Sequence, residues 1–318
     1  MPNPPTESLA VVIPAYKPDY LAAALDSLAA QTDRGFRVYI GDDASPHDLA
    51  AVVQPFADRL DLRLHRFEEN IGRRDLVAQW NRTIRLSDET WVWLFSDDDV
   101  ADPGCVAAWR AALGGSNQAE VMRFQTRIIG ADGREERRNE PHPEFESAAD
   151  FILARLRRQR RSYACEVLFT RRAFDRVGGL ISFPLAWCSD DASWAALAGP
   201  AGLRTLAGPL VSWRYGGGNL SVPDPASRAA KREALLRYVE WLLNEDHPAL
   251  AATPAQRAAI RAALPSWFWH QLHVADALVR PSDLRRLAAQ LGQPCGLRHL
   301  LGHNLRRLAQ RIKAQVRP

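Results

Sequence analysis

The sequence predicts an α/β protein in which helices cover a mostly parallel sheet and a helical appendage follows. Three observations support this prediction. In the first hundred residues, short apolar runs alternate with helical segments, as in strand–helix–strand units with right-handed crossovers. Acidic residues follow two of these runs, at the sheet edge where parallel sheets bind ligands. From about Pro225 the chain is rich in alanine, leucine and arginine at helical spacing.

Four strands and three helices are expected before residue 100. The strand candidates are apolar, alternating or aromatic runs, and they cover residues 9–13, 36–40, 62–67 and 91–95. Residues 20–31 carry leucines at helical spacing, and residues 75–86 form a further helix candidate. A shorter helix is expected near Ser45, because Ser45, Pro46 and Asp48 supply N-cap, N1 and N3 signals.

The same domain is expected to continue beyond residue 100. Further strand candidates cover residues 120–129, 165–170 and 202–213. They are separated by glycine-rich breaks at 114–117 and 216–218, a turn at 131–133 and a proline-containing loop at 140–146. We place the end of this domain at residue 222, which leaves residues 223–318 as the C-terminal helical region.

The composition is that of an ordinary globular protein. Of 318 residues, 47% are hydrophobic and 25% are charged, and the net charge of +4 is too small to imply nucleic-acid binding. The cysteines at 105, 165, 188 and 295 form no CxxC pair, which argues against a zinc site or a disulfide framework. Neither a signal peptide nor a membrane-spanning stretch is found. We therefore expect a cytoplasmic protein that would lie on the surface of a membrane, if it works at one.

Three consecutive carboxylates, Asp97, Asp98 and Asp99, follow the strand candidate at 91–95. They repel one another unless a cation lies between them, and a hard divalent ion commonly bridges carboxylates to phosphates. A solvated acidic turn is the alternative, but the position at the end of an apolar strand favours a ligand site. Asp102 with Pro103 is typical of a helix N-cap and is left out of the site.

Two weaker signals belong to the same sheet edge. Asp42 and Asp43 end the second strand candidate, where a carboxylate can accept a hydrogen bond from a base or a ribose, or serve the turn alone. Arg73 and Arg74 follow Asn70-Ile-Gly72. Guanidinium groups suit bidentate phosphate binding, although surface arginines are common.

The second half of the chain offers an acidic pair and an aromatic segment. Asp190 and Asp191 follow the apolar run 183–188, and a carboxylate beside apolar walls can act as a general base. The start of a helix explains the pair equally well. Trp213, Arg214 and Tyr215 precede three glycines. They are either a lid that stacks on a ligand and clamps phosphate, or an ordinary strand end.

Six of these segments, taken in order, resemble glycosyltransferase family 2 and its nucleotide-sugar domain of the GT-A type. They are VVIPAY at 11–16, LDSL at 25–28 with Gln31 and Thr32, GDDAS at 41–45, NIG at 70–72 with Asn81, SDDDV at 96–100 with Pro103, and residues 174–180 before Asp190 and Asp191. The resemblance covers roughly residues 9 to 221. It implies a GT-A fold with a mostly parallel sheet between helices.

The resemblance also implies roles in donor binding. Asp43 would contact the nucleotide base with Asp42 beside it, and Asp97 would lie near the ribose and the metal. Asp98 would ligate Mn²⁺ or Mg²⁺, with Asp99 as the alternative ligand. The remaining donor-binding candidates are Pro14, Tyr16, Arg73, Arg74 and Arg214.

On the acceptor side, the resemblance implies that Asp191 deprotonates the acceptor hydroxyl, while Asp190 orients the acceptor or caps the following helix. The resulting function is an inverting transfer from a nucleotide-sugar, with UDP as the family's usual nucleotide, to a carbohydrate or lipid-linked hydroxyl. Bacterial cell-surface polysaccharide or glycolipid biosynthesis is the expected setting.

The sequence departs from the family pattern at three places, and it leaves other functions open. The usual DxD is DDD, the acceptor-side pair is Asp–Asp in place of Glu–Asp, and no histidine lies near residues 213–215. A nucleotidyltransferase acting on sugar phosphates is one alternative, but residues 14–18 lack the glycine-rich loop expected of it. A non-catalytic scaffold subunit of a polysaccharide assembly complex is the other.

The end of the chain suggests a contact with an anionic partner. Between Arg298 and Arg317 there are six basic residues and no acidic one, and leucines fall near one helical face. Such a helix can lie in a lipid interface, or it can dock on the main domain with a solvated basic face. A peripheral position on the inner face of the membrane is therefore a further expectation.

Overall fold

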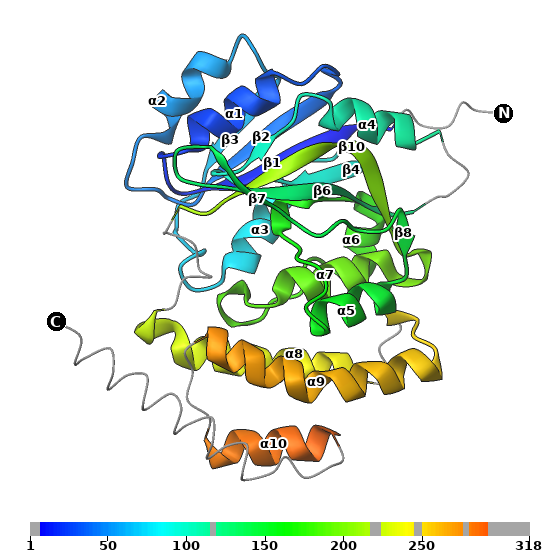
Figure 1. The fold of residues 1–318 in the computed structure, drawn as a ribbon. Helices are drawn as coiled ribbons and strands as arrows, with labels where there is room; N and C mark the ends of the chain where they lie inside the picture. The colour runs from blue at the N-terminus through cyan, green and yellow to red at the C-terminus, as the bar shows by residue number, and fades with distance from the viewer. Residues whose placement is uncertain (1–6, 115–118, 217–223, 245–249, 276–279, 292–318) are drawn as a thin grey trace.

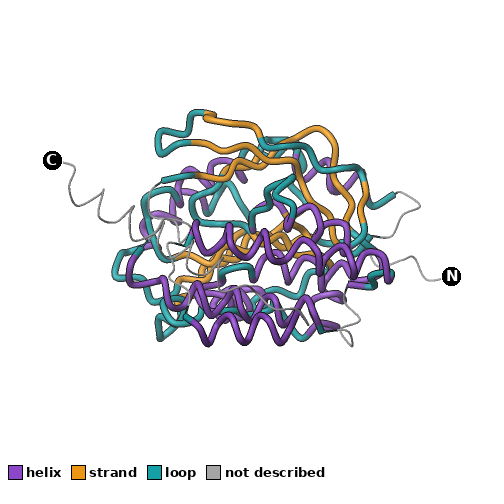
Figure 2. The backbone as a smooth tube through the Cα atoms, turned by 60° about the horizontal axis from the view of Figure 1, so that its bottom comes forward, coloured by secondary structure: helices purple, strands orange, loops and turns teal. Residues whose placement is uncertain are grey.

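The computed structural model describes residues 7–114, 119–216, 224–244, 250–275 and 280–291. In this part of the chain a ten-stranded sheet forms the centre, with strand order β3-β2-β1-β4-β9-β6-β10-β5 and with β7 and β8 at its margin. Helices cover the sheet, and the C-terminal helices form a further layer below it (Figure 1). The turned view brings these helices forward, in front of the strands (Figure 2).

The first four strands of the central sheet are parallel and confirm the prediction. They are β1 (Leu9–Ala15), β2 (Phe36–Asp42), β3 (Leu62–Arg66) and β4 (Trp91–Leu94). Pairing of β1 with both β2 and β4 begins at Leu9, which faces Phe36 on one side and Trp91 on the other. Since the strands start level, their carboxyl ends form one edge, and the acidic segments 42–43 and 97–99 follow at that edge.

The second half makes the sheet mixed, because β9 runs antiparallel to both β4 and β6. The further strands are β5 (Val100–Ala101), β6 (Val121–Ile129), β7 (Glu135–Arg138), β8 (Phe145–Glu146), β9 (Val167–Thr170) and β10 (Leu203–Arg214). The long strand β10 runs parallel to β6 and pairs antiparallel with the short β5. The pairing of β5 with β10 brings residues 97–99 beside the end of β10.

Two groups of helices cover the two faces of the sheet. One face packs on α1 (Leu21–Ala29), α2 (Leu49–Val53) and α4 (Cys105–Ala112), and the other packs on α3 (Leu76–Ile84), α5 (Ala148–Leu156), α6 (Arg171–Val177) and α7 (Ser189–Ala198). Short 3₁₀ helices lie between them: η1 (Gln54–Phe56), η2 (Ala164–Glu166), η3 (Pro184–Ala186), η4 (Gly199–Ala201) and η5 (Pro225–Ser227). Along β1, alternate residues enter the two cores, as the two-residue period of a strand requires.

Two predicted helix caps are wrong. Helix α2 begins at Leu49 and its cap is Asp48, whose side chain accepts a hydrogen bond from the Ala51 N–H at 3.1 Å. Ser45 lies outside the helix because Asp42 holds it in the preceding turn. Helix α4 is preceded by Gly104 as its cap. Asp102 accepts hydrogen bonds from Leu210 N–H of β10 and from Arg127, so its side chain joins strands instead of capping.

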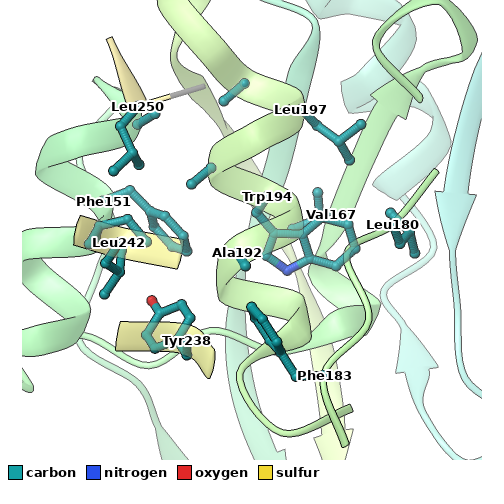
Figure 3. Packing of buried hydrophobic residues seen from close by; sticks show 14 of the residues in the cluster. Phe151, Val167, Leu180, Phe183, Ala192, Trp194, Leu197, Tyr238, Leu242 and Leu250 are labelled. Atoms are coloured by element: carbon teal, nitrogen blue, oxygen red, sulfur yellow. The ribbon is translucent and has the colours of Figure 1, made fainter. Parts of the chain in front are cut away.

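The C-terminal helices are α8 (Arg228–Leu243), α9 (Pro254–Val274) and α10 (Pro281–Leu291). The first two share one buried cluster with α5 and α7, in which Tyr238 and Leu242 of α8 lie with Phe151 of α5 and Trp194 of α7 (Figure 3). Among the described helices, none combines the length and the apolar character that a bilayer crossing requires.

Two other expectations concern cysteines and the chain end. The described cysteines, Cys105, Cys165 and Cys188, are free thiols. Cys295 and the basic segment 298–317 lie outside the described residues. The domain boundary at residue 222 stays a prediction, although α8 and α9 bury their apolar faces against the preceding domain.

Substitution of Leu235 by alanine should destabilise the whole protein. Leu235 of α8 is fully buried in the shared cluster, and such a truncation costs about 2–5 kcal/mol in unfolding free energy. Urea denaturation followed by tryptophan fluorescence should give one transition at lower urea. The exposed Arg237 on the same helix, changed to alanine, is the control and should leave the midpoint nearly unchanged. Two separate transitions, with only one of them shifted, would show that the C-terminal helices fold independently.

Candidate active site

A cavity of about 480 Å³ opens at the carboxyl edge of the parallel strands. Its size is typical of sites for small organic ligands. It is lined by Pro14, Ala15, Tyr16, Lys17, Asp19, Tyr20, Asp43, Leu76, Gln79, Asp97, Asp98 and Gly216. Of the predicted site residues, Pro14, Tyr16, Asp43, Asp97 and Asp98 are therefore brought together. Lys17, Tyr20 and Gln79 were not predicted, and only their nearness to strand ends in the sequence could have indicated them.

Asp97 holds the loop that follows β1. One oxygen, Oδ2, accepts hydrogen bonds from the backbone N–H groups of Tyr16 at 3.0 Å and Lys17 at 3.2 Å. Burial raises the pKa of Asp97, and these two hydrogen bonds oppose the rise. The carboxylate therefore fixes the floor of the cavity while its other oxygen stays available.

Asp99 and Asp98 differ in what they bind. Asp99 is 1% exposed, and its Oδ1 accepts the backbone N–H of Arg214 at 2.8 Å. Its Oδ2 is buried and accepts no well-formed hydrogen bond from the described residues, while the side chains of Cys165 and Ser96 lie beside the carboxylate and lower its pKa. The carboxylate of Asp98 lines the cavity, and no donor from the described part of the chain reaches it. Burial raises the pKa of both groups, and the charges of Asp99 and Asp97 add to the rise at Asp98.

A divalent cation fits this arrangement. The unpartnered Oδ2 of Asp99 and the free carboxylate of Asp98 are hard oxygen donors whose charges repel each other. Within the described residues, no three histidine, cysteine or acidic side chains converge to enclose an ion. An ion held by Asp98 and Asp99 would therefore also need oxygens from a ligand or water, as Mg²⁺ commonly does.

Arg214 closes the side of the cavity that faces β10. Its guanidinium lies 4.4 Å from the centre of the Tyr20 ring and donates to the carbonyl oxygens of Asp98 at 2.8 Å and Gly130 at 3.0 Å. The side chain is buried and lies behind Tyr20 instead of lining the cavity. Its charge lowers the pKa of Asp98, against the larger effects of burial and of the neighbouring aspartates.

Asp43 anchors the loop that carries the Asn-Ile-Gly segment. Its Oδ1 accepts the Ile71 N–H at 3.0 Å and its Oδ2 accepts the Gly72 N–H at 2.9 Å. A Cβ atom on Gly72 would lie 2.5 Å from Oδ2, so only glycine allows this close approach. Arg82 of α3 also binds Asp43 and stacks on Phe67, with 3.8 Å from the guanidinium carbon to the ring centre. No pattern in the sequence indicated a role for Arg82.

Besides Arg214, three predicted donor-binding residues do not line the cavity. Asp42 is 2% exposed and binds the Ser45 N–H at 2.7 Å and Arg66 at 2.6 Å, so it stabilises the turn after β2. Arg73 and Arg74 are exposed, and Arg74 pairs with Glu69 at 3.4 Å. Their role in donor binding stays a prediction.

The loop that carries the acidic pair is tied to α3. The Asn81 side chain accepts the Leu180 N–H at 2.8 Å and donates to the Leu180 carbonyl at 3.2 Å. Gly179 has a φ of +113°, and a Cβ there would lie 3.1 Å from the Asn81 side-chain oxygen. Ser182 donates to Asp75 at 3.0 Å. Since Leu76 and Gln79 of α3 line the cavity, these contacts hold the loop beside it.

Asp190 and Asp191 lie in the first turn of α7, and their environments differ. Asp191 is 4% exposed, and its Oδ1 accepts a hydrogen bond from Arg155 Nε at 2.7 Å. Asp190 is partly exposed, and its Oδ1 accepts the Asp191 N–H at 2.9 Å. Burial, and next the charge of Asp191, raise the pKa of Asp190 well above its usual value. Such a carboxyl can take up a proton near neutral pH.

The two aromatic residues of the predicted segment 213–215 lie in different environments. Trp213 stacks on Tyr163, with 4.5 Å between ring centres, and Tyr215 is 46% exposed. Neither aromatic residue lines the cavity, so a role in ligand stacking is not part of the described site.

Comparisons with known proteins agree with this geometry. The family model described as glycosyl transferase family 2 matches residues 10–175. The structure of S. aureus TarS 1–349 has a TM-score of 0.63 at 16% identity, over 96% of this chain and 82% of that chain. The complex of the same protein with UDP-GlcNAc has a TM-score of 0.60 at 17% identity, over 90% and 88%.

A third solved structure is the mannosyltransferase PcManGT from Pyrobaculum calidifontis in complex with GDP-Man and Mn²⁺. Its TM-score is 0.52 at 16% identity, over 98% of this chain and 89% of that chain. At these identities the likeness shows the fold, which is of the GT-A type with C-terminal helices.

Replacement of Asp43 by asparagine should lower both stability and donor binding. The amide keeps one acceptor oxygen but presents an N–H group where Asp43 now accepts hydrogen bonds. The expected loss is about 1–3 kcal/mol in unfolding free energy, measured by urea denaturation. Binding of UDP and GDP should weaken alike, because the loop itself is disturbed. Arg73→Ala, at an exposed position, is the control. Unchanged stability with loss of one nucleotide only would identify Asp43 as a base-recognition residue.

Proposed function

Because this chain belongs to glycosyl transferase family 2, we propose that it transfers a sugar from a nucleotide-sugar donor to a hydroxyl acceptor, with a divalent cation and with inversion at the anomeric carbon. The observation that supports this most directly is the cavity at the sheet edge, where the free Asp98 carboxylate lies with Asp43 and Asp97. A nucleotidyltransferase or a scaffold subunit is less consistent with the family match.

The donor is proposed to bind in this cavity with its diphosphate toward Asp98. The similar structures include complexes with UDP-GlcNAc, UDP and GDP-Man, all of which carry a nucleoside diphosphate. Lys17 and Arg214 place positive charge on either side of the aspartates, which suits an anionic ligand. Tyr16 and Tyr20 offer flat apolar surface at the cavity wall. UDP is our default nucleotide.

Mn²⁺ or Mg²⁺ would be held by Asp98 and Asp99, the pair with a free carboxylate and a buried unpartnered oxygen. When bound, such an ion neutralises charge on the leaving diphosphate. Asp97 keeps the loop after β1 in place below the donor. The presence of Mn²⁺ with GDP-Man in the similar PcManGT structure supports this proposal.

The acidic pair is proposed to supply the general base. As the acceptor oxygen forms its bond to the anomeric carbon, its proton moves to a carboxylate, and the bond to the diphosphate breaks with its electrons on the diphosphate. Family resemblance alone gives this role to Asp191. The ion pair of Asp191 with Arg155, and the partial exposure of Asp190, lead us to assign the proton to Oδ2 of Asp190.

The acceptor is proposed to be a carbohydrate or a lipid-linked sugar, in the synthesis of a bacterial cell-surface polysaccharide or glycolipid. A peripheral contact with the inner face of the membrane is part of this proposal. This membrane contact would be made by segment 298–317. Liposome co-sedimentation with anionic vesicles tests it, because the full chain should bind more than a version that ends near Gln293.

Asp98→Asn should abolish the metal dependence of donor binding. A hard cation loses a charged oxygen, and the diphosphate loses the cation. Isothermal titration of UDP-GlcNAc and GDP-Man, with and without Mn²⁺, measures the effect. Asp61→Asn, at an exposed ion pair on the far edge of the sheet, is the matched control. Donor binding that keeps its affinity and its response to Mn²⁺ in Asp98→Asn would remove Asp98 from the metal site.

Asp190→Asn should lower kcat by about 10²–10⁴-fold while donor binding stays intact. The amide has nearly the same volume but accepts no proton. Release of nucleoside diphosphate in the presence of acceptor measures turnover, and activity of the natural protein should fall as acid protonates Asp190, at a higher pH than for an ordinary carboxyl. Asp191→Asn should be the milder variant.

The reverse pattern, an inactive Asp191→Asn with an active Asp190→Asn, would return the base to Asp191. Near-full activity of both variants would show that the acidic pair has no catalytic role and only begins helix α7.

A further inference from the structure

Arg155, near the end of α5, connects the acidic pair to the rest of the domain. Its Nε donates to Asp191 Oδ1 at 2.7 Å, and one of its terminal nitrogens donates to the Arg160 carbonyl at 2.7 Å. Two hydrogen bonds in different directions fix the guanidinium plane. Asp191 is thereby paired with a guanidinium, whereas the hydrogen bond that Asp190 accepts comes from the backbone N–H of Asp191.

The ion pair is enclosed by the C-terminal layer. Tyr238 of α8 is fully buried and packs edge-on against Phe183, with 5.9 Å between ring centres. Figure 3 shows its ring beside Leu242 and Phe183, with the hydroxyl directed toward the side where Phe151 of α5 lies. Four residues after Phe151, Arg155 lies on the same face of α5. Water is thus excluded from one side of the ion pair, which strengthens its electrostatic effect.

The backbone before the pair is strained, and its neighbours hold it. Leu185, Ala186 and Cys188 have φ values of 58°, 54° and 66°, in the left-handed region that costs about 1–3 kcal/mol for a residue other than glycine. The side chains of Ser189 and Ser193 accept the N–H groups of Phe183 at 2.9 Å and Ile181 at 2.9 Å. Such strain persists only where the surroundings fix the geometry.

We propose that Arg155 is the positioning residue of the acidic pair: by binding Asp191 it holds that carboxylate in an ion pair and leaves Asp190 as the proton acceptor. This inference rests on the proposed function. It also makes helix α5 part of the catalytic unit, although this helix does not line the donor cavity.

The charges around Asp190 define the expected direction. Asp191 raises the pKa of Asp190, and Arg155 of α5 lowers it. Cys188 and Tyr238 also face the pair, and burial raises the pKa of both well above their usual values, so both stay neutral. Removal of the Arg155 charge therefore leaves two facing carboxylates without a counter-charge. Asp190 should then keep its proton to higher pH, and the acid limb of the kcat profile should move upward.

The test compares Arg155→Met, Arg155→Lys and Tyr238→Phe in the full chain. Methionine keeps length without charge, and lysine keeps the charge without the planar fork. Tyr238→Phe is the matched control, because it removes a buried hydroxyl that has no hydrogen-bond partner in the described part of the chain. The measurements are kcat against pH from nucleoside diphosphate release with acceptor, binding of UDP-GlcNAc, and thermal unfolding.

Arg155→Met should move the acid limb upward by roughly one pH unit or more. Below the new limb, kcat should fall about tenfold for each unit moved, with donor affinity unchanged. In Arg155→Lys, the acid limb of the kcat profile should lie close to its position in the natural protein. Tyr238→Phe should leave both kcat and the position of the limb unchanged.

Three results would overturn the inference. They are a folded Arg155→Met whose limb does not move, an equal shift in Tyr238→Phe, and, where Arg155→Met fails to fold, an Arg155→Gln variant whose limb does not move. A natural protein that releases no nucleoside diphosphate from any donor would instead contradict the proposed function. Donor turnover by the natural protein therefore separates the two failures.

Discussion

The candidate site depends on one constraint: a carboxylate taken out of water must find hydrogen-bond donors or a cation. At the carboxyl edge of the sheet, Asp42 binds Ser45 and Arg66, Asp43 binds the loop at 71–72, and Asp97 binds the loop after β1. Each of these bonds fixes a turn that shapes the cavity. Asp98 lines the cavity with a carboxylate that no described donor reaches, and Asp97, Asp99 and Asp190 each keep one oxygen without a partner among the described residues. The partners of the other aspartates therefore decide which carboxylates are left for chemistry.

The sequence predicted the parallel half of the fold well, because its strands are apolar runs with turn residues at their ends. All four early strands were found within two residues of their expected ends, and the helix expected at 75–86 is α3 with Asp75 as its cap. The acidic triplet and Asp43 were found at the cavity for the same reason, since strand ends can be read from pattern alone. The strand expected at 165–170 is β9, but its antiparallel direction was not predicted, and neither was the two-residue strand β5. Their pairing depends on contacts between distant segments.

Residues that act through other residues were missed. Arg155 and Arg82 stand in ordinary helical patterns, and their partners Asp191 and Asp43 are 36 and 39 residues away in the sequence. A carboxylate can be recognised by its position at a strand or helix end, but the guanidinium that binds it comes from whichever helix packs there. The same limit explains the wrong caps at Ser45 and Asp102. Both side chains match a local capping pattern, yet Ser45 donates its hydroxyl to the Tyr16 carbonyl and Asp102 accepts the Leu210 N–H of β10.

The end of β10 explains how the three aspartates can lie so close together. Arg214 belongs to the segment where the sequence lacks the histidine expected from the family resemblance, and it is buried with hydrogen bonds to three backbone carbonyl groups and a ring beneath it. A guanidinium stays charged at any physiological pH, whereas an imidazole does not. Its fixed charge beside Asp98 offsets part of the repulsion among the three carboxylates. Because Arg214 donates to carbonyl oxygens and not to the Asp98 carboxylate, that offset leaves the carboxylate free to bind a cation.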